Sequence, residues 1–199
     1  MSSPWTDSVV LAVHIKIKWG HAADLQLLNP EMLLAHTEEL HKRVCAAFED
    51  DENACFEGGL NNVYRAAWKI GLKDEKTTIL QPLNACRRLF QSASGFNRWA
   101  THEGLPTISI HCGLDAGGVI WIDKGPLGEI VNSAVQLSDV ACESQAAIVA
   151  TRSAMQMGGY DKKQFYYTQV CLKIGVNNRK DVVHLKIEDL DDGVMRGDV

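Results

Sequence analysis

The stretch ISIHCGLDAGGVIWIDKGPLGEIVNSAVQL, residues 108–137, decides the fold of this chain. It opens with apolar residues at every second position over 108–114, which is the period of a strand with one buried face. Gly117-Gly118 then predicts a turn, and the apolar run Val119–Ile122 predicts a second strand. A helical segment follows Gly128. The stretch therefore predicts a strand, a glycine turn, a strand and a helix in close succession.

The first third of the chain carries a similar mixture of signals. Val9–Ile15 is a nearly continuous apolar run, which is typical of a central strand with both faces covered. Asn29-Pro30-Glu31 predicts a helix start, because Asn caps, Pro suits the first turn and Glu complements the helix dipole. Two strands, around 54–57 and 63–68, are expected to form a hairpin through the loop 58–62, which is rich in glycine and asparagine.

The rest of the chain continues the alternation of helices and strands. A second long helix is expected to begin near Pro82, with apolar residues at helical spacing as far as Ala100. Beyond residue 137 the sequence predicts four further elements, which are a buried strand, one helical turn and two alternating strands: 146–150, 151–155, 165–174 and 182–187.

The composition and charge of the chain narrow its function class. The 199 residues carry a formal net charge of −5, which argues against a nucleic-acid binder because phosphate binding needs clustered Lys and Arg. No apolar run approaches the ~18–20 residues that cross a bilayer, and the first residues lack a signal-peptide pattern. We therefore expect a cytoplasmic protein without membrane insertion. Its six dispersed cysteines are expected to be small core residues in a reducing compartment.

The stretch over residues 108–137 resembles the class III adenylyl/guanylyl cyclase homology domain. In that family a strand, a glycine turn and a strand precede the pattern G-[DN]-x-VN-x-A-x-R-L. The resemblance rests on five framework residues: Gly128, Val131, Asn132, Ala134 and Leu137. The arginine that the family uses to stabilise the transition state is replaced by Gln136. The resemblance thus implies the family's scaffold with altered chemistry.

The resemblance implies an α+β fold, with a ferredoxin-like βαββαβ core, extra C-terminal strands and a mixed or antiparallel sheet covered by helices. We expect one domain over residues 1–199, with a core at about 9–187 and a polar tail at 189–199. A generic ferredoxin-like fold that only imitates the motif is the alternative. That fold would lack the short helix and the two strands after Leu137.

In the family, two Asp carboxylates hold two divalent metals for phosphoryl transfer, and the site forms between two chains. The first metal position corresponds to His14 here and the second to Asn62. A neutral imidazole and a neutral amide are poor ligands for Mg²⁺, which prefers anionic oxygens. Glu57 is the nearby carboxylate, and we expect it on the other face of the sheet. The resemblance therefore implies no metal in the site, and Mg²⁺ or Mn²⁺ only if cyclase activity persists.

The other positions of the family site have also changed. The two residues that select the base correspond to Gly58 and Gly125, which offer no side chain. Asn132, which positions the ribose in the family, is retained. It also has a simpler interpretation as a residue that hydrogen-bonds the start of a helix. A soft-metal pair of His14 and His111 is a weaker alternative, and we expect His14 to be satisfied by backbone instead. Asp115 and Asp123, beside the glycine pair, are expected to be solvated.

These substitutions lead to one functional prediction and two alternatives. The prediction is a catalytically inactive cyclase-like domain that serves as a dimerisation, scaffold or regulatory module. It would form a homodimer or pair with another cyclase-type domain, using the segment Asn61–Tyr64 and the expected hairpin at Gly117. The first alternative is a nucleotide sensor without turnover. The second is a residual adenylate or guanylate cyclase, which makes a cyclic nucleotide from ATP or GTP.

Overall fold

The computed structural model describes residues 8–20, 28–49, 54–58, 63–70, 75–122, 125–157, 170–174 and 178–185. The predicted polar tail, the loop that holds Asn61 and Asn62, and Asp123 lie outside these residues. Within the described ranges no helix has the length and apolar character that a membrane span requires.

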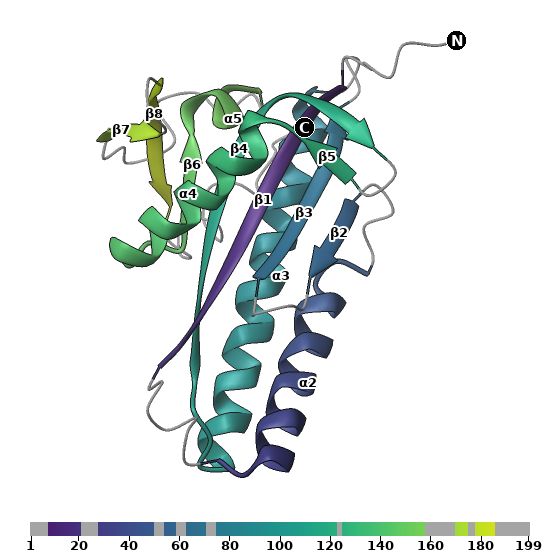
Figure 1. Cartoon of the computed structure of the whole chain (residues 1–199), viewed down its shortest axis with the longest axis vertical. Helices are drawn as coiled ribbons and strands as arrows, with labels where there is room; N and C mark the ends of the chain where they lie inside the picture. Colours follow the sequence, from purple (N-terminus) through teal and green to yellow (C-terminus); the bar gives the residue numbers. More distant parts are fainter. Residues whose placement is uncertain are drawn as a thin grey trace, which may run out of the picture.

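An eight-stranded mixed sheet forms the centre of the molecule (Figure 1). Seven strands follow the order β2-β3-β1-β4-β6-β8-β7, and β5 pairs with β4 beside this path. The pairing of β4 with β6 is parallel and the other pairings are antiparallel. The strands are β1 Ser8–Trp19, β2 Ala54–Gly58, β3 Val63–Ile70, β4 Ile108–Ile122, β5 Gly125–Leu127, β6 Ile148–Thr151, β7 Val170–Ile174 and β8 Asn178–Leu185.

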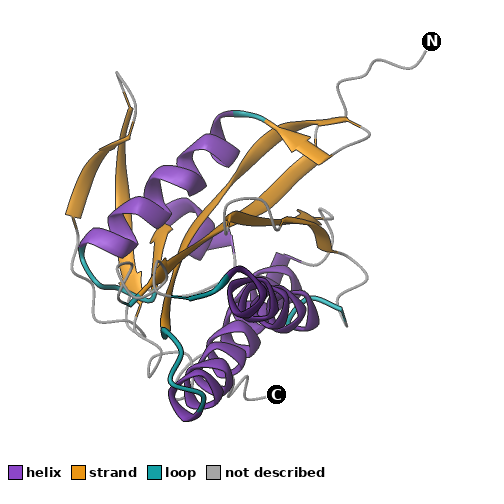
Figure 2. Ribbon diagram, turned by 60° about the horizontal axis from the view of Figure 1, so that its bottom comes forward, coloured by secondary structure: helices purple, strands orange, loops and turns teal. Residues whose placement is uncertain are grey.

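Helices cover both faces of this sheet (Figure 2). The long helices α2 (Pro30–Ala46) and α3 (Glu75–His102) lie side by side on one face, and the short helix α5 (Arg152–Met157) contributes to the same core. Helix α4 (Glu129–Glu143) covers the opposite face. This arrangement confirms the predicted α+β fold with a βαββαβ core. The presence of α5, β7 and β8 argues against a generic ferredoxin-like fold.

The two faces of the sheet differ in what they bury. The face under α2 and α3 holds the main apolar cluster, in which Trp68, Phe96 and Leu89 are fully buried. Val13, Ile15 and Ile17 of β1 join this cluster, because alternate side chains of a strand point to the same face. His14 and Lys16 of the same strand therefore face α4. Strand β1 therefore contributes apolar side chains to the main core on one face of the sheet and polar side chains beneath α4 on the other.

Local sequence signals set the start of α2 as predicted. The Asn29 side chain accepts a hydrogen bond of 2.8 Å from the backbone N–H of Met32, and Pro30 is the first helical residue. His36, Leu40 and Val44 face the core. Of these, His36 was not predicted to be buried. Its Nε2 bonds the carbonyl of Pro106 at 3.0 Å, which ties α2 to the segment before β4.

Two predicted elements differ in the structure. Gly117-Gly118 does not form a turn, since β4 continues through both residues and pairs with Val10 and Val9 of β1. The chain reverses only after Ile122, where β4 pairs with β5. The second long helix begins at Glu75, so that Pro82 lies inside α3 and not at its start.

Candidate functional site

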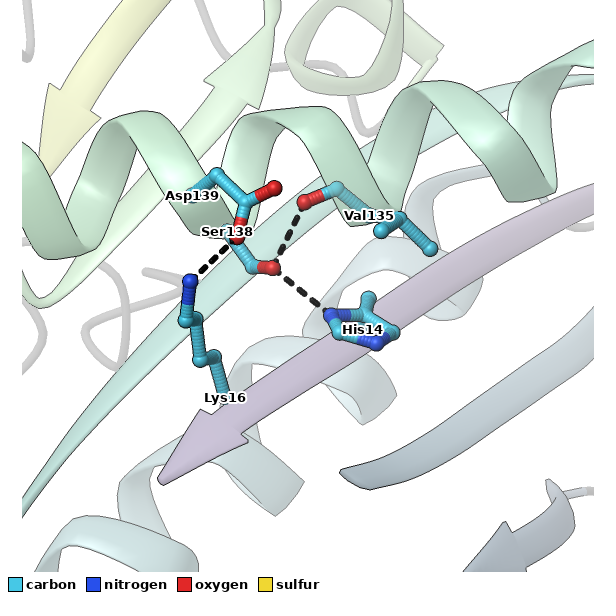
Figure 3. A network of polar contacts seen from close by, with 5 residues as sticks. All are labelled: His14, Lys16, Val135, Ser138 and Asp139. Atoms are coloured by element: carbon cyan, nitrogen blue, oxygen red, sulfur yellow. Dashed lines mark hydrogen bonds and ion pairs between the residues drawn. The ribbon is translucent and has the colours of Figure 1, made fainter. Parts of the chain in front are cut away.

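His14 occupies the middle of β1 and points toward α4 (Figure 3). Its Nδ1 lies 2.6 Å from Ser138 Oγ, and Ser138 Oγ donates to the carbonyl of Val135 at 2.7 Å. The single hydroxyl proton of Ser138 is thus committed to Val135, so His14 Nδ1 must be the donor to Ser138. The prediction that backbone satisfies His14 is therefore wrong, because its partner is a helix side chain.

The electrostatic surroundings of His14 favour its neutral form. The pKa of His14 is lowered to about 4, chiefly by burial and also by the nearby positive charges of Arg65 and Lys16, while the negative charge of Asp139 opposes them. Lys16 Nζ forms an ion pair with Asp139 at 2.5 Å, and this hydrogen bond raises the pKa of Lys16 (Figure 3). At neutral pH His14, which the resemblance aligns with the first metal position of the family, is thus an uncharged imidazole near the cationic side chains of Arg65 and Lys16.

Three polar residues form a row across the sheet beside α4. Arg65 of β3 pairs directly with His14 of β1 on one side and with Glu57 of β2 on the other. Directly paired residues point to the same face, so Glu57 lies on the His14 face. The expectation that Glu57 faces the other side is wrong. Sequence reasoning also missed Arg65, whose position depends on the register of three strands and not on a local motif.

A cavity of about 40 Å³ lies beside this row, between the sheet and α4. His14, Glu57, Arg65 and Val131 are among its lining residues. Sites for drug-sized ligands usually measure about 300–1,000 Å³. The enclosed space is therefore far too small for a nucleoside triphosphate within the described part of one chain.

The donor set of the row does not fit the two divalent cations of the cyclase family. Glu57 supplies one carboxylate and His14 one neutral nitrogen, but Arg65, which carries a fixed positive charge, is paired between them in the sheet. No group of three or more His, Cys, Asp or Glu side chains suited to a metal occurs among the described residues. Hard cations need several anionic oxygens and are repelled by an adjacent fixed positive charge. The second metal position, Asn62, lies outside the described residues.

The positions that select the base lie apart from His14. A Cβ built on Gly58 would lie 2.3 Å from the Tyr64 ring, and Tyr64 belongs to the core on the α2 face. A side chain at residue 58 would therefore clash with that core and point away from the His14 row. Gly125 pairs with Ile122 at the end of the β4–β5 hairpin. Neither glycine comes together with His14.

Asn132 and Gln136 are exposed, one helical turn apart on α4. Gly128 is the N-cap of α4 and no side chain caps this helix, so Asn132 does not have the predicted helix-start role. The inward face of α4 presses on the sheet at Gly113, where a Cβ would lie 2.0 Å from the carbonyl of Ala134. This close approach turns Asn132 and Gln136 away from the His14 row of the same chain.

The remaining candidates are structural. His111 Nδ1 bonds the carbonyl of Ala146 at 2.8 Å and Nε2 bonds Ser109 at 3.1 Å, so His111 and His14 do not form a metal pair. Asp115 is fully buried and accepts hydrogen bonds from the Thr151 hydroxyl and the Ala116 N–H, which contradicts its predicted solvation. Cys86 and Cys112 are buried as expected, whereas Cys45, Cys55 and Cys142 are only partly buried.

The fold has clear relatives among solved structures. The guanylyl cyclase Cya2 superimposes with a TM-score of 0.68 and 14% identity, over 90% of this chain and 93% of that chain. The adenylyl cyclase CyaB from P. aeruginosa gives 0.65 and 12%, over 89% and 93%. The monomeric guanylyl cyclase domain of the RhoGC fusion protein from the aquatic fungus Blastocladiella emersonii gives 0.60 and 16%, over 89% and 98%.

Comparison with protein-family models gives no match, and neither does comparison with curated proteins. Identities below a quarter establish likeness of fold and leave activity open. The agreement nevertheless extends over about nine-tenths of the chain. The chain therefore has the fold of the class III adenylyl and guanylyl cyclase domains.

Proposed function

We propose that this chain is a catalytically inactive cyclase-like domain that acts by pairing with another domain of the same fold. The observation that carries the proposal is the row Glu57–Arg65–His14, in which a neutral histidine, at the position that the resemblance aligns with the first metal ligand, is paired with an arginine. Two-metal phosphoryl transfer requires cations at that place to neutralise the triphosphate and activate the attacking hydroxyl. A row with one carboxylate, a fixed positive charge and a neutral histidine lacks the anionic oxygens that such cations need.

Helix α4 carries the other substituted position, the one that the resemblance aligns with the transition-state arginine. In the resemblance to the cyclase family, α4 of one chain supplies the ribose and transition-state residues to the metal site of the other chain. Gln136 carries no charge and Asn132 is the residue retained at these positions. The chain therefore supplies neither the metal half nor the arginine half of a shared site. Pairing with an intact cyclase domain would leave both shared sites of the assembly without one half, so we assign the chain a scaffold or regulatory role.

The surface that carries this pairing differs from the predicted one. Tyr64 is buried against Phe56 and His41, and Gly117 is inside a strand and not at a hairpin tip. Neither provides an exposed contact. The exposed side of α4, with Asn132 and Gln136, is the part of the described structure that corresponds to the shared site of the family. We therefore place the pairing surface there.

Sedimentation of the purified chain, alone and mixed with an active class III cyclase domain, tests this proposal. We expect a dimer or a mixed dimer that weakens when Gln136 is replaced by Trp, with Glu38→Trp on exposed α2 as the matched control. We also expect the mixture to show altered cyclic nucleotide production. A monomer at 100 μM that neither binds nor alters the active domain would contradict the proposal.

The two alternatives make different predictions for the same samples. A nucleotide sensor would bind ATP or GTP without turnover, and a residual cyclase would form a cyclic nucleotide with Mn²⁺. The glycine at residue 58 offers no side chain that selects a base. The structural observations thus favour pairing over sensing.

A further inference from the structure

A second and much larger cavity lies on the opposite face of the sheet from the His14 row. It measures about 640 Å³ and forms a groove between α3 and the segment that joins α4 to β6. Phe90, Ala93, Arg98, Ile110 and Ala147 are among its lining residues. We call it the α3 groove. No residue of the row Glu57–Arg65–His14 contributes to it, so it needs an explanation of its own.

The floor of the α3 groove is the edge of β4 beyond the end of β6. Ile148, the first residue of β6, pairs with Cys112, so β4 residues 108–111 extend beyond the end of their neighbour. At Ile108 the carboxamide of Asn97 takes the place of a neighbouring strand, since it bonds both the N–H and the C=O, at 2.8 and 2.9 Å. At Cys112 the N–H donates to the carbonyl of Ala147 at 2.9 Å.

Ile110 lies between these two satisfied positions. Backbone groups of alternate residues in a strand point to the same side, so the N–H and C=O of Ile110 point into the α3 groove as those of Ile108 do. Among the described residues they have no hydrogen-bond partner. A buried backbone pair normally finds a partner, and an open edge attracts another extended chain. The groove thus offers the hydrogen bonds of strand addition.

The chain itself supplies a segment at the right place. Strand β8 ends at Leu185, which pairs with Ile148 at the start of β6. Because β8 runs antiparallel to β6, the chain leaves β8 toward the level of Ile110. Ile110 is about two strand spacings and two residues away, or roughly 12 Å. At about 3.3 Å per residue, four or five residues cover this distance and bring residues 189–190 to the groove.

The sequence of residues 186–199, which lie outside the described part of the structure, suits the α3 groove. It places Leu190 among Glu188, Asp189, Asp191 and Asp192. With Leu190 opposite Ile110, its side chain would face the apolar wall of Phe90 and Ala93, since directly paired residues share a face. Glu188 and Asp192 would then point to the same side as Leu190, where the exposed guanidinium of Arg98 lines the groove.

We propose that the acidic segment 186–199 docks in the α3 groove as a short antiparallel strand beside β4, with Leu190 paired to Ile110 and an acidic neighbour paired to Arg98. The docked segment would close the open edge of the sheet and tie the end of β8 to α3. This inference is independent of the proposed pairing function, because it concerns the opposite face.

Amide hydrogen exchange at Ile110 in the full chain tests the docking. Docking predicts that Leu190→Ser speeds exchange of this amide about tenfold, whereas Val194→Ser, outside the predicted contact, leaves it unchanged. Arg98→Glu should also speed exchange, and adding Glu188→Lys and Asp192→Lys to it should restore protection. The amide of Leu114, inside the β1–β4–β6 ladder, serves as the reference for global stability.

Two results would overturn the proposal. The first is an Ile110 amide that exchanges at the same rate in the wild-type chain and in Leu190→Ser. The second is protection that survives Leu190→Ser and rises with protein concentration, which would show that a second copy covers the edge. A synthetic peptide of residues 186–199 added to Leu190→Ser should restore protection of Ile110, while a peptide carrying the same serine should not.

Discussion

The two faces of the central sheet differ more than any other two regions of this molecule. Beneath α2 and α3, strand β1 contributes Val13, Ile15 and Ile17 to an apolar core rich in aromatic rings. Beneath α4, the same strand contributes His14 and Lys16 to a network of polar contacts. The first face specifies the fold through packing, and the second holds His14, which the resemblance aligns with a metal position of the cyclase family. Substitutions on the second face are therefore expected to leave the fold intact.

The largest effect is expected from a substitution on the packed face of the sheet, beneath α2 and α3. Phe96 is fully buried, and its ring lies 4.8 Å from that of His36 and 5.5 Å from that of Trp99. Phe96→Ala would remove these contacts and leave a cavity, so we expect a loss of about 3–5 kcal/mol in the free energy of unfolding. Urea denaturation measures the loss. A cost below about 1 kcal/mol would show that this face does not determine stability.

The close contact between α4 and β4 gives the next largest effect. Gly113→Ala would place a methyl group 2.0 Å from the Ala134 carbonyl and 2.4 Å from the Ser138 N–H, both backbone atoms that cannot rotate away. We expect a loss of about 2–3 kcal/mol. Gly118→Ala is the matched control on the same strand, because a Cβ there meets nothing within 4 Å. Equal stability of the two variants would contradict the packing of α4 described above.

A pH dependence distinguishes the polar face from the packed one. The pKa of His14 is lowered to about 4 in the folded chain, against 6.5 in an unfolded chain. The unfolded chain therefore binds more protons between these values, so His14 makes the folded state less stable as the pH falls from 6.5 toward 4. At pH 5 this amounts to about 1–2 kcal/mol after allowance for solvent screening.

The variant His14→Gln isolates that contribution, since Gln does not titrate and keeps a hydrogen-bond donor for Ser138. We expect its stability at pH 5, relative to pH 7.5, to fall less than that of the wild-type chain by the same 1–2 kcal/mol. Burial also lowers the pKa of His36 and His184, so part of the acid sensitivity must remain in the variant. Identical pH profiles for the two proteins would rule out a buried neutral His14.

Restoring the family arginine is expected to have the smallest effect. Gln136 is exposed, so Gln136→Arg should change the free energy of unfolding by no more than about 0.5 kcal/mol. It should also yield no cyclic nucleotide from ATP or GTP, because the row Glu57–Arg65–His14 is unchanged. Product formation by this single variant, measured against Gln136→Lys, would show that the metal half of the site is intact.

The sequence predicted the elements whose signals are local. Asn29-Pro30 placed the start of α2, and the pattern around Asn132 placed α4. The predicted turn at Gly117-Gly118 was wrong. A glycine pair is typical of turns, but here both residues pair with the long neighbouring strand β1. The predicted solvation of Asp115 was wrong for a similar reason, since its hydrogen-bond partner Thr151 lies on a strand that comes later in the chain.

The candidate site was predictable in part. The loss of metal ligands at His14 was visible in the resemblance to the cyclase family. The positive charge beside His14 could not be predicted, because Arg65 is paired with His14 only through the register of β1 and β3. The partner of His14, Ser138, is 124 residues away and depends on how α4 packs on Gly113. Alternation along β2 and β3 is the sequence signal that would have placed Glu57 and Arg65 on the same face.

The most direct measurement of the central claim is calorimetric titration of the purified chain with ATP and with GTP, each with Mn²⁺. A row whose donor set does not suit divalent cations predicts no binding heat for either nucleotide and no cyclic nucleotide in the same samples. Binding tighter than about 100 μM, or some −5.5 kcal/mol, would contradict the account and show that the polar face still forms a nucleotide site.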